Sequence, residues 1–516
     1  MNISSVKAKR CVLVLIVMTY ALFILGFSNG EEPVREGSLK PGTPENVVVE
    51  VFAGSGEFKF EEGEALKAGF RYPYGLAIDK DGGLLVADSF NHAVRKIIDG
   101  TVETIAGGYD EGMLDPYGFP DGGYVDGKKA VSRFNKPRGI ALNSKGVIYI
   151  TDTENHSIRK IVGDKVVTWA GSGSAGYRNG KGNTAEFCFP TGIAIDKFDN
   201  IYVADTLNNC IRKISPNGIV TLFAGKPGDE GGYKDGWLFE AMFNEPTGLA
   251  FDNEGNLYIA DSGNQVIRKI SGSMVSTYAG VVNENEKIAE TGYYKGGYRD
   301  GNRETALFNF PKGLAVTGNG TVVVADTWNN RIRAVKPDGE VITIAGTGEP
   351  GEVTGPAGKA MFSGPVDVVY CSGFLYISDM WNNTIKRMPF DEENPIQINI
   401  PDIDEIQFEP YSENIQVWID GIKVEFPDVK PFTEDGVQFV PVRFVFETWG
   451  AEVDWEQETK TVIIKKEYKV ALIHTNEEPV VFKNDRTMVS TQYMSEKFGF
   501  SVEWIPEYNA VVFVTQ

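Results

Sequence analysis

Histidine and cysteine are scarce in this chain. Its 516 residues include 3 histidines and 4 cysteines. Cys188, Cys210 and Cys371 are the cysteines beyond the first 30 residues, and their wide spacing argues against a disulfide framework. We expect these three to be small buried thiols. So few histidines also disfavour a zinc centre built from several imidazoles.

Basic residues are few relative to acids. Lysine and arginine total 50 against 71 acids, which gives a net charge of −21. Residues 1–30 hold three basic residues and no acid, so the rest of the chain has 47 − 71 = −24. Such an acidic surface argues against nucleic acid and anionic membranes as partners, and it suits solubility outside a cell.

The long apolar run of the chain lies at its N-terminus. Lys7, Lys9 and Arg10 precede the apolar residues 11–27, and the small Ser28 follows. This order predicts a secretory signal peptide over residues 1–30, followed by a linker over 31–46. The run is close to the lower limit of about 17 residues for a membrane span, so an uncleaved anchor is the alternative. We expect an extracellular or cell-surface protein, with no membrane span once the signal is cleaved.

Common catalytic motifs are also missing. The chain has no Gly-x-Ser-x-Gly nucleophile elbow, no P-loop and no recognisable catalytic Cys/His pattern. The motifs therefore give no direct evidence for an enzyme.

A sixfold repeat dominates what is present. Each copy opens with Pro-x-Gly (Asp in place of Gly in the sixth), passes through an Asp-x-x-Asn turn and continues as a stretch such as Ile-Arg-Lys-Ile. The opening prolines are Pro73, Pro137, Pro190, Pro246, Pro311 and Pro365. A period slightly above 40–50 residues, with several short strands in each copy, is typical of a β-propeller with extended loops.

Each repeat predicts four strands, because four short apolar stretches are separated by turn residues. The sixth copy lacks the fourth stretch, and residues 47–54 match it. We therefore expect residues 47–54 to complete the last blade and close the ring, which removes the free sheet edges.

Long glycine-rich loops join the repeats, and four of them share a Gly-Tyr-x-Asp/Asn-Gly motif. Their tyrosines are Tyr124, Tyr177, Tyr233 and Tyr298. A short helical stretch that buries a phenylalanine is expected after each motif. The winding of a blade predicts that these loops and the Asp-x-x-Asn turns lie at the same end. The tyrosines are either ligand contacts or struts beneath their own loops.

The Pro-x-Gly-Ile-Ala, Val-Ala-Asp-Thr-x-Asn and Ile-Arg-Lys-Ile stretches of residues 47–390 resemble the NHL-repeat β-propeller family. The resemblance implies an all-β six-bladed β-propeller. It says little about function, because propellers host many functions.

A second domain is expected after an acidic, proline-containing linker at residues 391–411. Residues 412–516 alternate predicted hairpins with two short helices, which indicates a small α+β domain. Residues 439–443 and 449–455 resemble the copper amine oxidase N-terminal domain, found in secreted bacterial proteins as a stalk or attachment module. That name suggests copper, but the domain offers only His474, Met488 and Met494 as soft ligands. Copper binding is therefore not expected.

Every repeat carries an Asp, an Asn three residues later and a basic residue four further on. We expect this set to hold the blades together, because it recurs in all six. It comprises Asp88, Asn91, Arg95, Asp152, Asn155, Arg159, Asp205, Asn208, Arg212, Asp261, Asn264, Arg268, Asp326, Asn329, Arg333, Asp379 and Asn382, with Lys386 as the sixth cation.

Asp367 replaces the glycine of the Pro-x-Gly opening in the sixth repeat. This position begins the innermost strand, so Asp367 is a candidate ligand contact or cation site at the channel mouth. The alternative is an imperfect final repeat.

Metal-dependent catalysis is the second reading, because propellers resembling this one include lactonases and a zinc lyase. His92 and His156 occupy equivalent positions in neighbouring repeats, but no third histidine joins them. Calcium could bind the acidic loop with Asp110, Glu111, Asp115 and Asp121, although no loop shows the spacing of an EF-hand. We expect no resident metal and no catalytic residue.

Three functions remain open at this stage. The first is a secreted or cell-surface binding protein that recognises an extracellular polymer, peptide or envelope component. In that reading the propeller recognises the ligand and the C-terminal domain attaches. The second is a lactonase-like hydrolase or lyase with its site at the channel mouth, and the third is a purely architectural surface protein.

Overall fold

The computed structural model describes residues 47–516, apart from several short gaps. The gaps are 110–113, 115–118, 229, 283–286, 289–291, 399–413, 420–421, 435–436, 449–450, 457–459, 467–468, 475–479, 484–485, 499–500, 506–508 and 515–516. The expected signal peptide, the segment 31–46, most of the linker 391–411, and Asp110, Glu111 and Asp115 lie outside the described residues. No described helix is long and apolar enough to cross a membrane.

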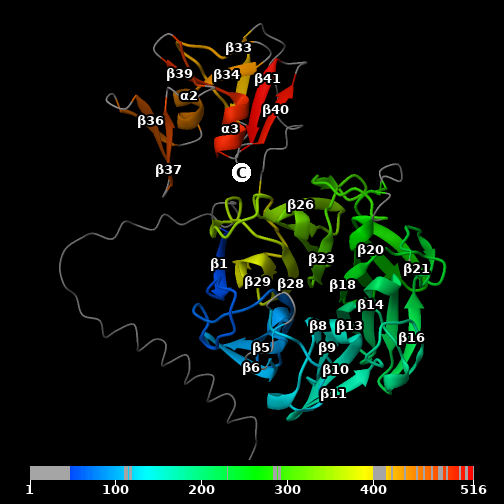
Figure 1. Ribbon diagram of the computed structural model, residues 1–516. Coiled ribbons are helices and arrows are strands. Elements are labelled where there is room, and N and C mark those ends of the chain that lie inside the picture. Colours follow the sequence, from blue (N-terminus) through cyan, green and yellow to red (C-terminus); the bar gives the residue numbers. More distant parts are fainter. Residues whose placement is uncertain are drawn as a thin grey trace, which may run out of the picture. The chain divides into compact units, whose positions relative to one another are not determined.

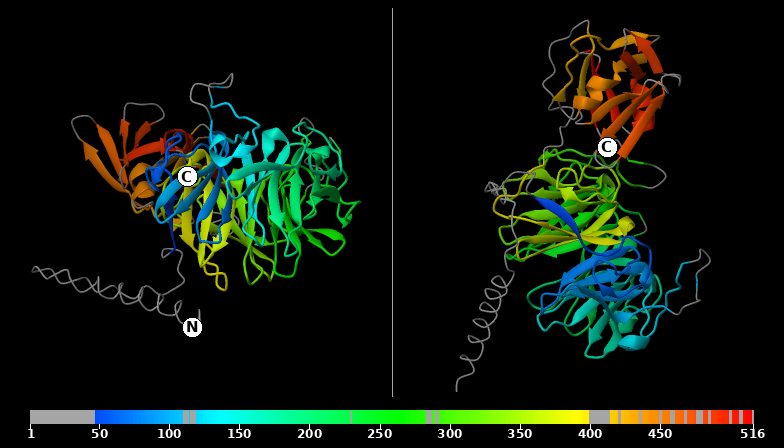
Figure 2. Two further views of the ribbon diagram at one scale, coloured as in Figure 1. Left: turned by 90° about the horizontal axis from the view of Figure 1, so that it is seen from below. Right: turned by 90° about the vertical axis from the view of Figure 1, so that its left-hand side faces the viewer.

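Six five-stranded antiparallel sheets surround a common axis, so residues 47–390 form a six-bladed β-propeller (Figure 1). In Figure 2 the strands of the blades run side by side along that axis. We number the blades 1 to 6 in the order of their innermost strands. These are β3 (Pro73–Ile78), β8 (Pro137–Leu142), β13 (Pro190–Ile195), β18 (Pro246–Phe251), β23 (Pro311–Val316) and β28 (Pro365–Cys371).

The second and third strands form hairpins in every blade, and a three-residue 3₁₀ turn joins them. The second strands are β4 (Leu84–Asp88), β9 (Ile148–Asp152), β14 (Ile201–Asp205), β19 (Leu257–Asp261), β24 (Val322–Asp326) and β29 (Phe374–Asp379). The turns are η2 (Ser89–Asn91), η4 (Thr153–Asn155), η6 (Thr206–Asn208), η7 (Ser262–Asn264), η9 (Thr327–Asn329) and η10 (Met380–Asn382). The third strands are β5 (Ala93–Ile98), β10 (Ser157–Val162), β15 (Cys210–Ile214), β20 (Val266–Ser271), β25 (Arg331–Val335) and β30 (Thr384–Pro389).

The fourth strand follows the third along the chain in blades 1 to 5. These strands are β6 (Thr101–Gly107), β11 (Lys165–Ala170), β16 (Ile219–Ala224), β21 (Met274–Ala279) and β26 (Glu340–Ala345). In blade 6 the fourth strand is β1 (Val48–Ala53), which pairs antiparallel with β30. The ring is thus closed by two strands more than 300 residues apart in sequence.

Each sheet has five strands, where the sequence predicts four. The fifth strand is a two-residue segment of the incoming loop that pairs with the start of the fourth strand. These outer strands are β2 (Gly63–Glu64), β7 (Gly127–Lys128), β12 (Gly180–Lys181), β17 (Gly236–Trp237), β22 (Gly301–Asn302) and β27 (Gly355–Pro356). Two residues are too few to show strand periodicity, so the sequence pattern did not reveal them.

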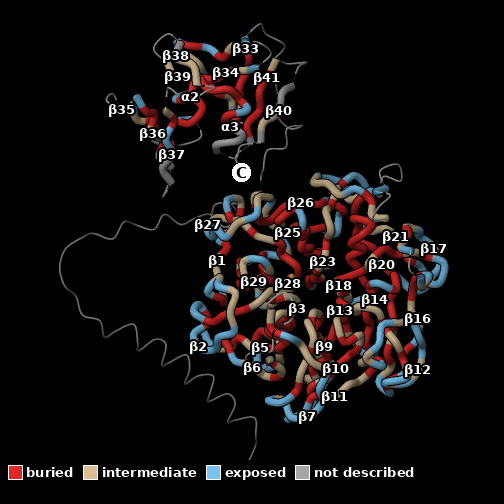
Figure 3. Tube along the Cα trace, in the orientation of Figure 1, coloured by how far each residue is buried: buried red, intermediate tan, exposed pale blue. Residues whose placement is uncertain are grey.

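The propeller core lies between neighbouring blades. Apolar residues on both faces of the strands pack against the next sheet, and exposed residues gather at the outer edges, near β7, β12 and β17 (Figure 3). The loops also bury the expected phenylalanines, which are Phe70, Phe134, Phe187, Phe243, Phe308 and Phe362. The expected helical stretch is a single 3₁₀ turn at η3 (Lys129–Val131) and η5 (Gly182–Thr184).

The three described cysteines are free thiols. Only Cys210 is buried, whereas Cys188 and Cys371 are partly exposed. The expectation of three buried thiols is therefore wrong for two of them, because both lie in or next to a loop at the edge of a strand.

The described part of the C-terminal domain contains three sheets and two short helices, α2 (Val442–Thr448) and α3 (Thr491–Phe498). One sheet holds β31 (Gln416–Ile419), β32 (Ile422–Lys423), β40 (Ser501–Ile505) and β41 (Ala510–Val514). The second holds β33 (Phe432–Glu434), β34 (Val437–Pro441), β38 (Val480–Lys483) and β39 (Arg486–Ser490). The third holds β35 (Glu452–Glu456), β36 (Thr461–Lys466) and β37 (Lys469–His474).

A strand, helix and hairpin occur twice in this domain, first as β34-α2-β35-β36 and then as β39-α3-β40-β41. The two copies meet where β34 pairs antiparallel with β39. They share one apolar core that includes Val445 and Met494. The small α+β domain predicted from the sequence is therefore present.

Candidate functional site

The Asp-Asn-Arg set forms a buried network in each blade. In blade 3, Asp205 Oδ2 accepts hydrogen bonds from Arg212 at 2.6 Å and from Asn208 at 2.8 Å. Asp205 Oδ1 accepts a third from the backbone N–H of Cys188 at 2.7 Å. Arg212 also donates to the carbonyl oxygen of Arg178 at 2.9 Å. The network therefore ties the incoming loop to the hairpin of the same blade.

The same bonds recur around the ring. The Asp–Arg distances in blades 1, 2, 4 and 5 lie between 2.6 and 2.8 Å, and all of these side chains are fully buried. Burial raises the pKa of Asp152 and of Asp205 to about 6, so both remain ionised at neutral pH beside their arginines. Buried groups that are bonded to one another in this way are suited to hold the blade together rather than to contact a ligand.

The four loop tyrosines pack on these arginines. The guanidinium carbon of Arg159 lies 5.0 Å from the ring centre of Tyr124, and Arg212 lies 4.5 Å from that of Tyr177. Arg268 and Arg333 contact Tyr233 and Tyr298 in the same way. Blade 1 has Phe60 in this place, 4.7 Å from Arg95. A ring without a hydroxyl group thus makes the same packing contact. This favours the interpretation that the tyrosines are struts beneath their own loops.

These tyrosines also lie along the outer edges of the blades. The hydroxyl groups of Tyr233 and Tyr298 form hydrogen bonds with Thr277 and Thr343 in the middle of the fourth strands, at 2.7 and 2.9 Å. Each loop contains the two-residue fifth strand of its sheet, which pairs with the start of the fourth strand. The loop therefore runs along the outer edge of the blade before it reaches the inner strand. The ligand-binding role of the tyrosines remains a prediction that these contacts do not favour.

A second network joins each blade to the next. The residue after each Asp-x-x-Asn turn has a left-handed backbone, and its side chain accepts a hydrogen bond from a backbone N–H of the following blade. We call these six positions the joint residues. They are His92, His156, Asn209, Gln265, Asn330 and Asn383. The last bond, from Tyr72 N–H to Asn383, joins blade 6 to blade 1.

The two propeller histidines therefore belong to the joints. His92 Nδ1 accepts from the N–H of Lys136 at 3.1 Å, so Nε2 carries the proton and donates to the carbonyl of Pro120 at 2.9 Å. His156 Nδ1 accepts from the N–H of Phe189 at 3.2 Å. Burial lowers the pKa of both imidazoles, which suits their neutral form. Both ring nitrogens of His92 are engaged and offer no lone pair to a metal.

Potential metal ligands do not gather elsewhere in the described part of the chain, where no three His, Cys, Asp or Glu side chains are grouped to hold an ion. The C-terminal residues do not fit a copper centre. Met488 and Met494 are fully buried in two separate apolar clusters, and His474 Nδ1 is hydrogen-bonded to Thr461. Clustered soft ligands are what copper requires.

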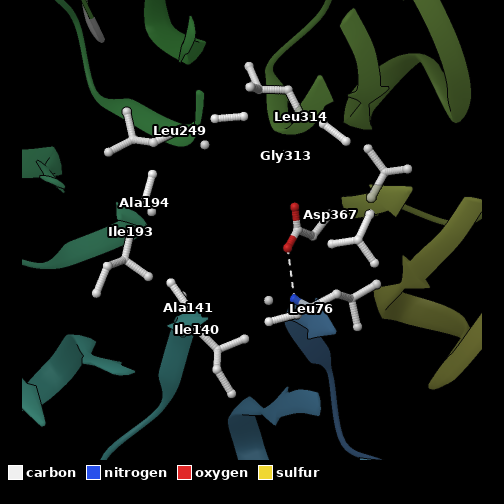
Figure 4. Close-up of a pocket in the computed structure, with 18 of the residues that line it drawn as sticks. Leu76, Ile140, Ala141, Ile193, Ala194, Leu249, Gly313, Leu314 and Asp367 are labelled. Carbon is white, nitrogen blue, oxygen red and sulfur yellow. Dashed lines mark hydrogen bonds between the residues drawn. The ribbon is translucent and has the colours of Figure 1, made fainter. Parts of the chain in front are cut away.

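The inner strands line a central cavity of about 390 Å³ (Figure 4). Most of its wall is aliphatic, as shown by Leu76, Ile193, Leu249 and Leu314. The five glycines of the Pro-x-Gly openings allow the strands to approach closely. A Cβ on Gly192 would lie 1.9 Å from the carbonyl oxygen of Thr247 in the next blade.

Asp367 is the acidic residue in the wall of this cavity (Figure 4). Its Oδ2 accepts the backbone N–H of Leu76 in blade 1 at 2.8 Å. Its carboxylate lies against Gly313 of blade 5, where an added Cβ would be 2.3 Å from Oδ1. Burial among strands raises its pKa to about 7, although part of the side chain borders the cavity. Asp367 thus bridges blades 5 and 1 at the position where the other blades have glycine.

The cavity differs between its two ends. The inner strands begin where the second strands end, because each opening proline pairs with the turn aspartate. We call this the turn end. Here the cavity is lined by Tyr74, Arg138, Thr191, Thr247 and Lys312, whereas Ile78, Leu142, Phe251, Val316 and Tyr370 line the opposite end. Polar and charged side chains are therefore more frequent at the turn end of the channel.

Two further rings of residues lie at the turn end and were not predicted from the sequence. The first consists of the pre-proline residues Tyr72, Lys136, Phe189, Glu245, Phe310 and Gly364, all with positive φ. The second consists of the turn residues Phe90, Glu154, Leu207, Gly263, Trp328 and Trp381, the third member of each Asp-x-x-Asn turn. Their variation between repeats is the sequence signal that would have revealed them.

Known proteins support both domain readings. The NHL repeat family matches residues 70–97, 134–161, 187–214, 243–270 and 308–334. The copper amine oxidase N-terminal domain matches residues 418–478.

Curated relatives match part of this chain. The chloroplastic protein SUPPRESSOR OF QUENCHING 1 of Arabidopsis thaliana is 31% identical over 339 residues, covering 64% of this chain and 31% of that protein. Human NHL repeat-containing protein 2 is 27% identical over 343 residues, covering 60% and 45%. The chain spans less than half the length of either relative. Among solved structures, an auxiliary nutrient binding protein from Bacteroides thetaiotaomicron has a TM-score of 0.49 and 15% identity, covering 66% of this chain and 76% of that one.

Proposed function

Because the chain is an NHL-repeat β-propeller protein that also contains a copper amine oxidase N-terminal domain, we propose that it is a binding protein of the cell exterior. The propeller recognises an extracellular polymer, peptide or envelope component at its turn end. The C-terminal domain attaches the protein to envelope or polymer. The N-terminal sequence and the excess of acidic residues support export.

One observation carries this proposal. In each blade the repeated Asp and its basic partner are buried and bonded to each other, while two rings of residues that differ between blades stand at the turn end. A scaffold that keeps its interior constant and varies one end is suited to recognition.

Hydrogen exchange on the purified chain tests the proposal. The chain is screened against immobilised polysaccharides, peptides and cell-wall fragments, and protection from exchange is mapped for each bound material. We expect the turn residues to be protected from exchange. Mass spectrometry should show that the bound material is recovered unchanged. Protection confined to the C-terminal domain would contradict recognition by the propeller, and cleavage of the material would contradict a purely binding role.

Asp367 supports one second candidate, a channel hydrolase. A carboxyl group with a pKa of about 7 in a cavity of about 390 Å³ is able to act as a general acid or base at neutral pH. Assays on lactone and ester substrates, with and without added divalent metal, test this candidate. Turnover that disappears in Asp367→Asn would establish it, and the absence of turnover in the parent protein would reject it.

A further inference from the structure

Two exposed tryptophans occupy equivalent positions in neighbouring blades. Trp328 of blade 5 is 56% exposed and Trp381 of blade 6 is 47% exposed. Both are the third residue of the Asp-x-x-Asn turn, where the other blades have phenylalanine, glutamate, leucine or glycine. Burial does not explain large aromatic side chains that are exposed to this degree.

Each indole is supported from beneath by the pre-proline residue of its own blade. The ring centres of Trp328 and Phe310 are 4.5 Å apart, with 31° between the ring planes. In blade 6 the supporting residue is Gly364, where an added Cβ would lie 2.8 Å from Cε3 of Trp381. One side of each ring is therefore covered, while about half of each side chain stays exposed.

The backbone fixes these rings in place. The N–H of Trp328 donates to the carbonyl of Asn309 at 3.0 Å, and the N–H of Trp381 donates to that of Ser363 at 3.0 Å. Asn330, two residues after Trp328, accepts the N–H of Gly364 at 3.0 Å. The turn that carries one tryptophan is thus bonded to the residue that supports the other. Such prior ordering reduces the entropy lost on binding.

The aromatic surface continues into blade 1. The ring centres of Phe90 and Tyr72 lie 4.8 Å apart, and Asn383 of blade 6 accepts the N–H of Tyr72. Phe310 and Tyr72 both have a left-handed backbone, which is unfavourable for aromatic residues. We call Phe310, Trp328, Trp381, Tyr72 and Phe90 the aromatic arc.

Polar groups flank the aromatic arc on both sides. Lys136 and Glu154 form an ion pair at 2.9 Å in blade 2, next to Phe90. On the other side, Glu245 accepts a hydrogen bond from Tyr293, whose ring packs against Phe310. Flat apolar rings bordered by donors and acceptors match the faces of a sugar ring, where C–H groups meet the aromatic ring and hydroxyls meet the polar groups.

We propose that the aromatic arc binds a neutral polysaccharide, with Trp328 and Trp381 as stacking platforms for its sugar rings. This inference rests on the proposed recognition function and names its ligand class. A neutral chain is favoured because a protein with a net charge of −21 repels acidic polymers. Two platforms on adjacent blades suit successive residues of a chain better than a single monosaccharide.

Affinity electrophoresis tests this assignment. The full chain is run through gels that contain β-glucan, xylan, mannan or starch, and pelleted with insoluble cellulose or chitin. We expect at least one of these neutral glycans to bind. The double variant Trp328→Ala/Trp381→Ala should then lose affinity about 50-fold, with roughly five- to tenfold for each ring. Trp328→Tyr should retain most of the binding.

Trp237 provides the matched control. It is 59% exposed, but it pairs with Met274 at the far end of blade 4, away from the aromatic arc. Trp237→Ala should leave affinity within twofold, and all variants should melt at the parent temperature. Undiminished glycan binding in the double variant would overturn the assignment of this surface.

The ligand class is tested separately. An array of proline-rich and other peptides is probed with the same variants. Peptide binding that depends on both tryptophans, with no glycan binding, would overturn the polysaccharide assignment and leave recognition at the turn end intact. Binding of neither probe class to the turn end would overturn both the assignment and the proposed function.

Discussion

Blade 6 differs from the other five blades in ways that show how the ring is held. Its fourth strand comes from the N-terminal end of the propeller, its buried cation is Lys386, and Asp367 replaces the inner glycine. Lys386 bonds to Asp379 at 2.8 Å and to one carbonyl, that of Met361. Arg268 of blade 4 bonds to two aspartates and two carbonyls.

The difference shows which bonds a blade requires and which it can lose. The guanidinium group of arginine donates hydrogen bonds to several atoms of the incoming loop, whereas the ammonium group of lysine donates fewer. Blade 6 instead gains a strand from the far end of the propeller sequence and a carboxylate that bridges to blade 1. The closing blade is therefore held by its neighbours more than by its own network.

The largest expected effect comes from removing the closing strand. Deletion of residues 47–54 exposes the edge of β30 and should cause loss of cooperative unfolding together with aggregation. Size-exclusion chromatography and thermal unfolding measure this, with a chain that begins at residue 47 as the control. A monomeric deletion variant with the parent melting temperature would show that blade 6 does not need β1.

Exchanging the buried cations sharpens the comparison. Arg268→Lys loses bonds to buried acceptors and should lower the free energy of unfolding by about 3 kcal/mol. The reverse change, Lys386→Arg, places a guanidinium group in blade 6 and should alter the free energy of unfolding by less than about 1 kcal/mol. Urea denaturation of both variants measures the difference. Equal losses would indicate that the two cations perform the same task.

The bridging carboxylate predicts a pH dependence. In the folded chain the pKa of Asp367 is raised from 3.8 to about 7. Between these two pH values the folded state therefore keeps a proton on Asp367 that the unfolded state has released. The free energy of unfolding should therefore fall as pH rises from about 4 to about 7 and then level off. Asp367→Asn should remove this slope. It should also raise the free energy of unfolding at pH 8 by about 2 kcal/mol, which is half of the free energy equivalent to the whole pKa shift, because the side chain is partly exposed.

The exposed Asp164→Asn is the control for this measurement and should follow the parent at every pH. Denaturant unfolding at intervals between pH 4 and 8 records the slopes. An Asp367→Asn protein with the parent's pH profile would show that this carboxyl group titrates as it does in the unfolded chain.

The smallest effect is expected at a joint. His92→Asn places in blade 1 the residue that performs the same task in blades 3, 5 and 6, so stability should change by no more than about 0.5 kcal/mol. His92→Ala removes both hydrogen bonds from a left-handed residue and should cost about 2 kcal/mol. Thermal unfolding of both variants distinguishes a joint from a ligand role. A large loss in His92→Asn would argue for a function that only imidazole supplies.

The repeated part of this protein was readable from the sequence. Six copies of one pattern revealed the propeller, because each copy must bury the same faces against its neighbours. The match of residues 47–54 to the missing fourth strand pointed to the pairing with β30 that the structure contains. The two short helices and the hairpins of the C-terminal domain followed from local periodicity and turn residues.

The loops and the recognition surface required the tertiary structure. The sequence suggested Tyr124 and its counterparts for a ligand face, but the path of each loop along the blade edge is set by a two-residue strand pairing. His92 and His156 resembled part of a metal site until the next blade supplied the N–H groups that they accept.

The sequence by itself determined the number of blades, the closing strand and the second domain, since these depend on the regular burial of apolar residues along the chain. Only the tertiary structure decided that Asp367 bridges two blades and that Trp328 and Trp381 stand on supporting residues of adjacent blades. Those relationships join residues far apart in the sequence, and the contacts that create them exist only once the ring has closed.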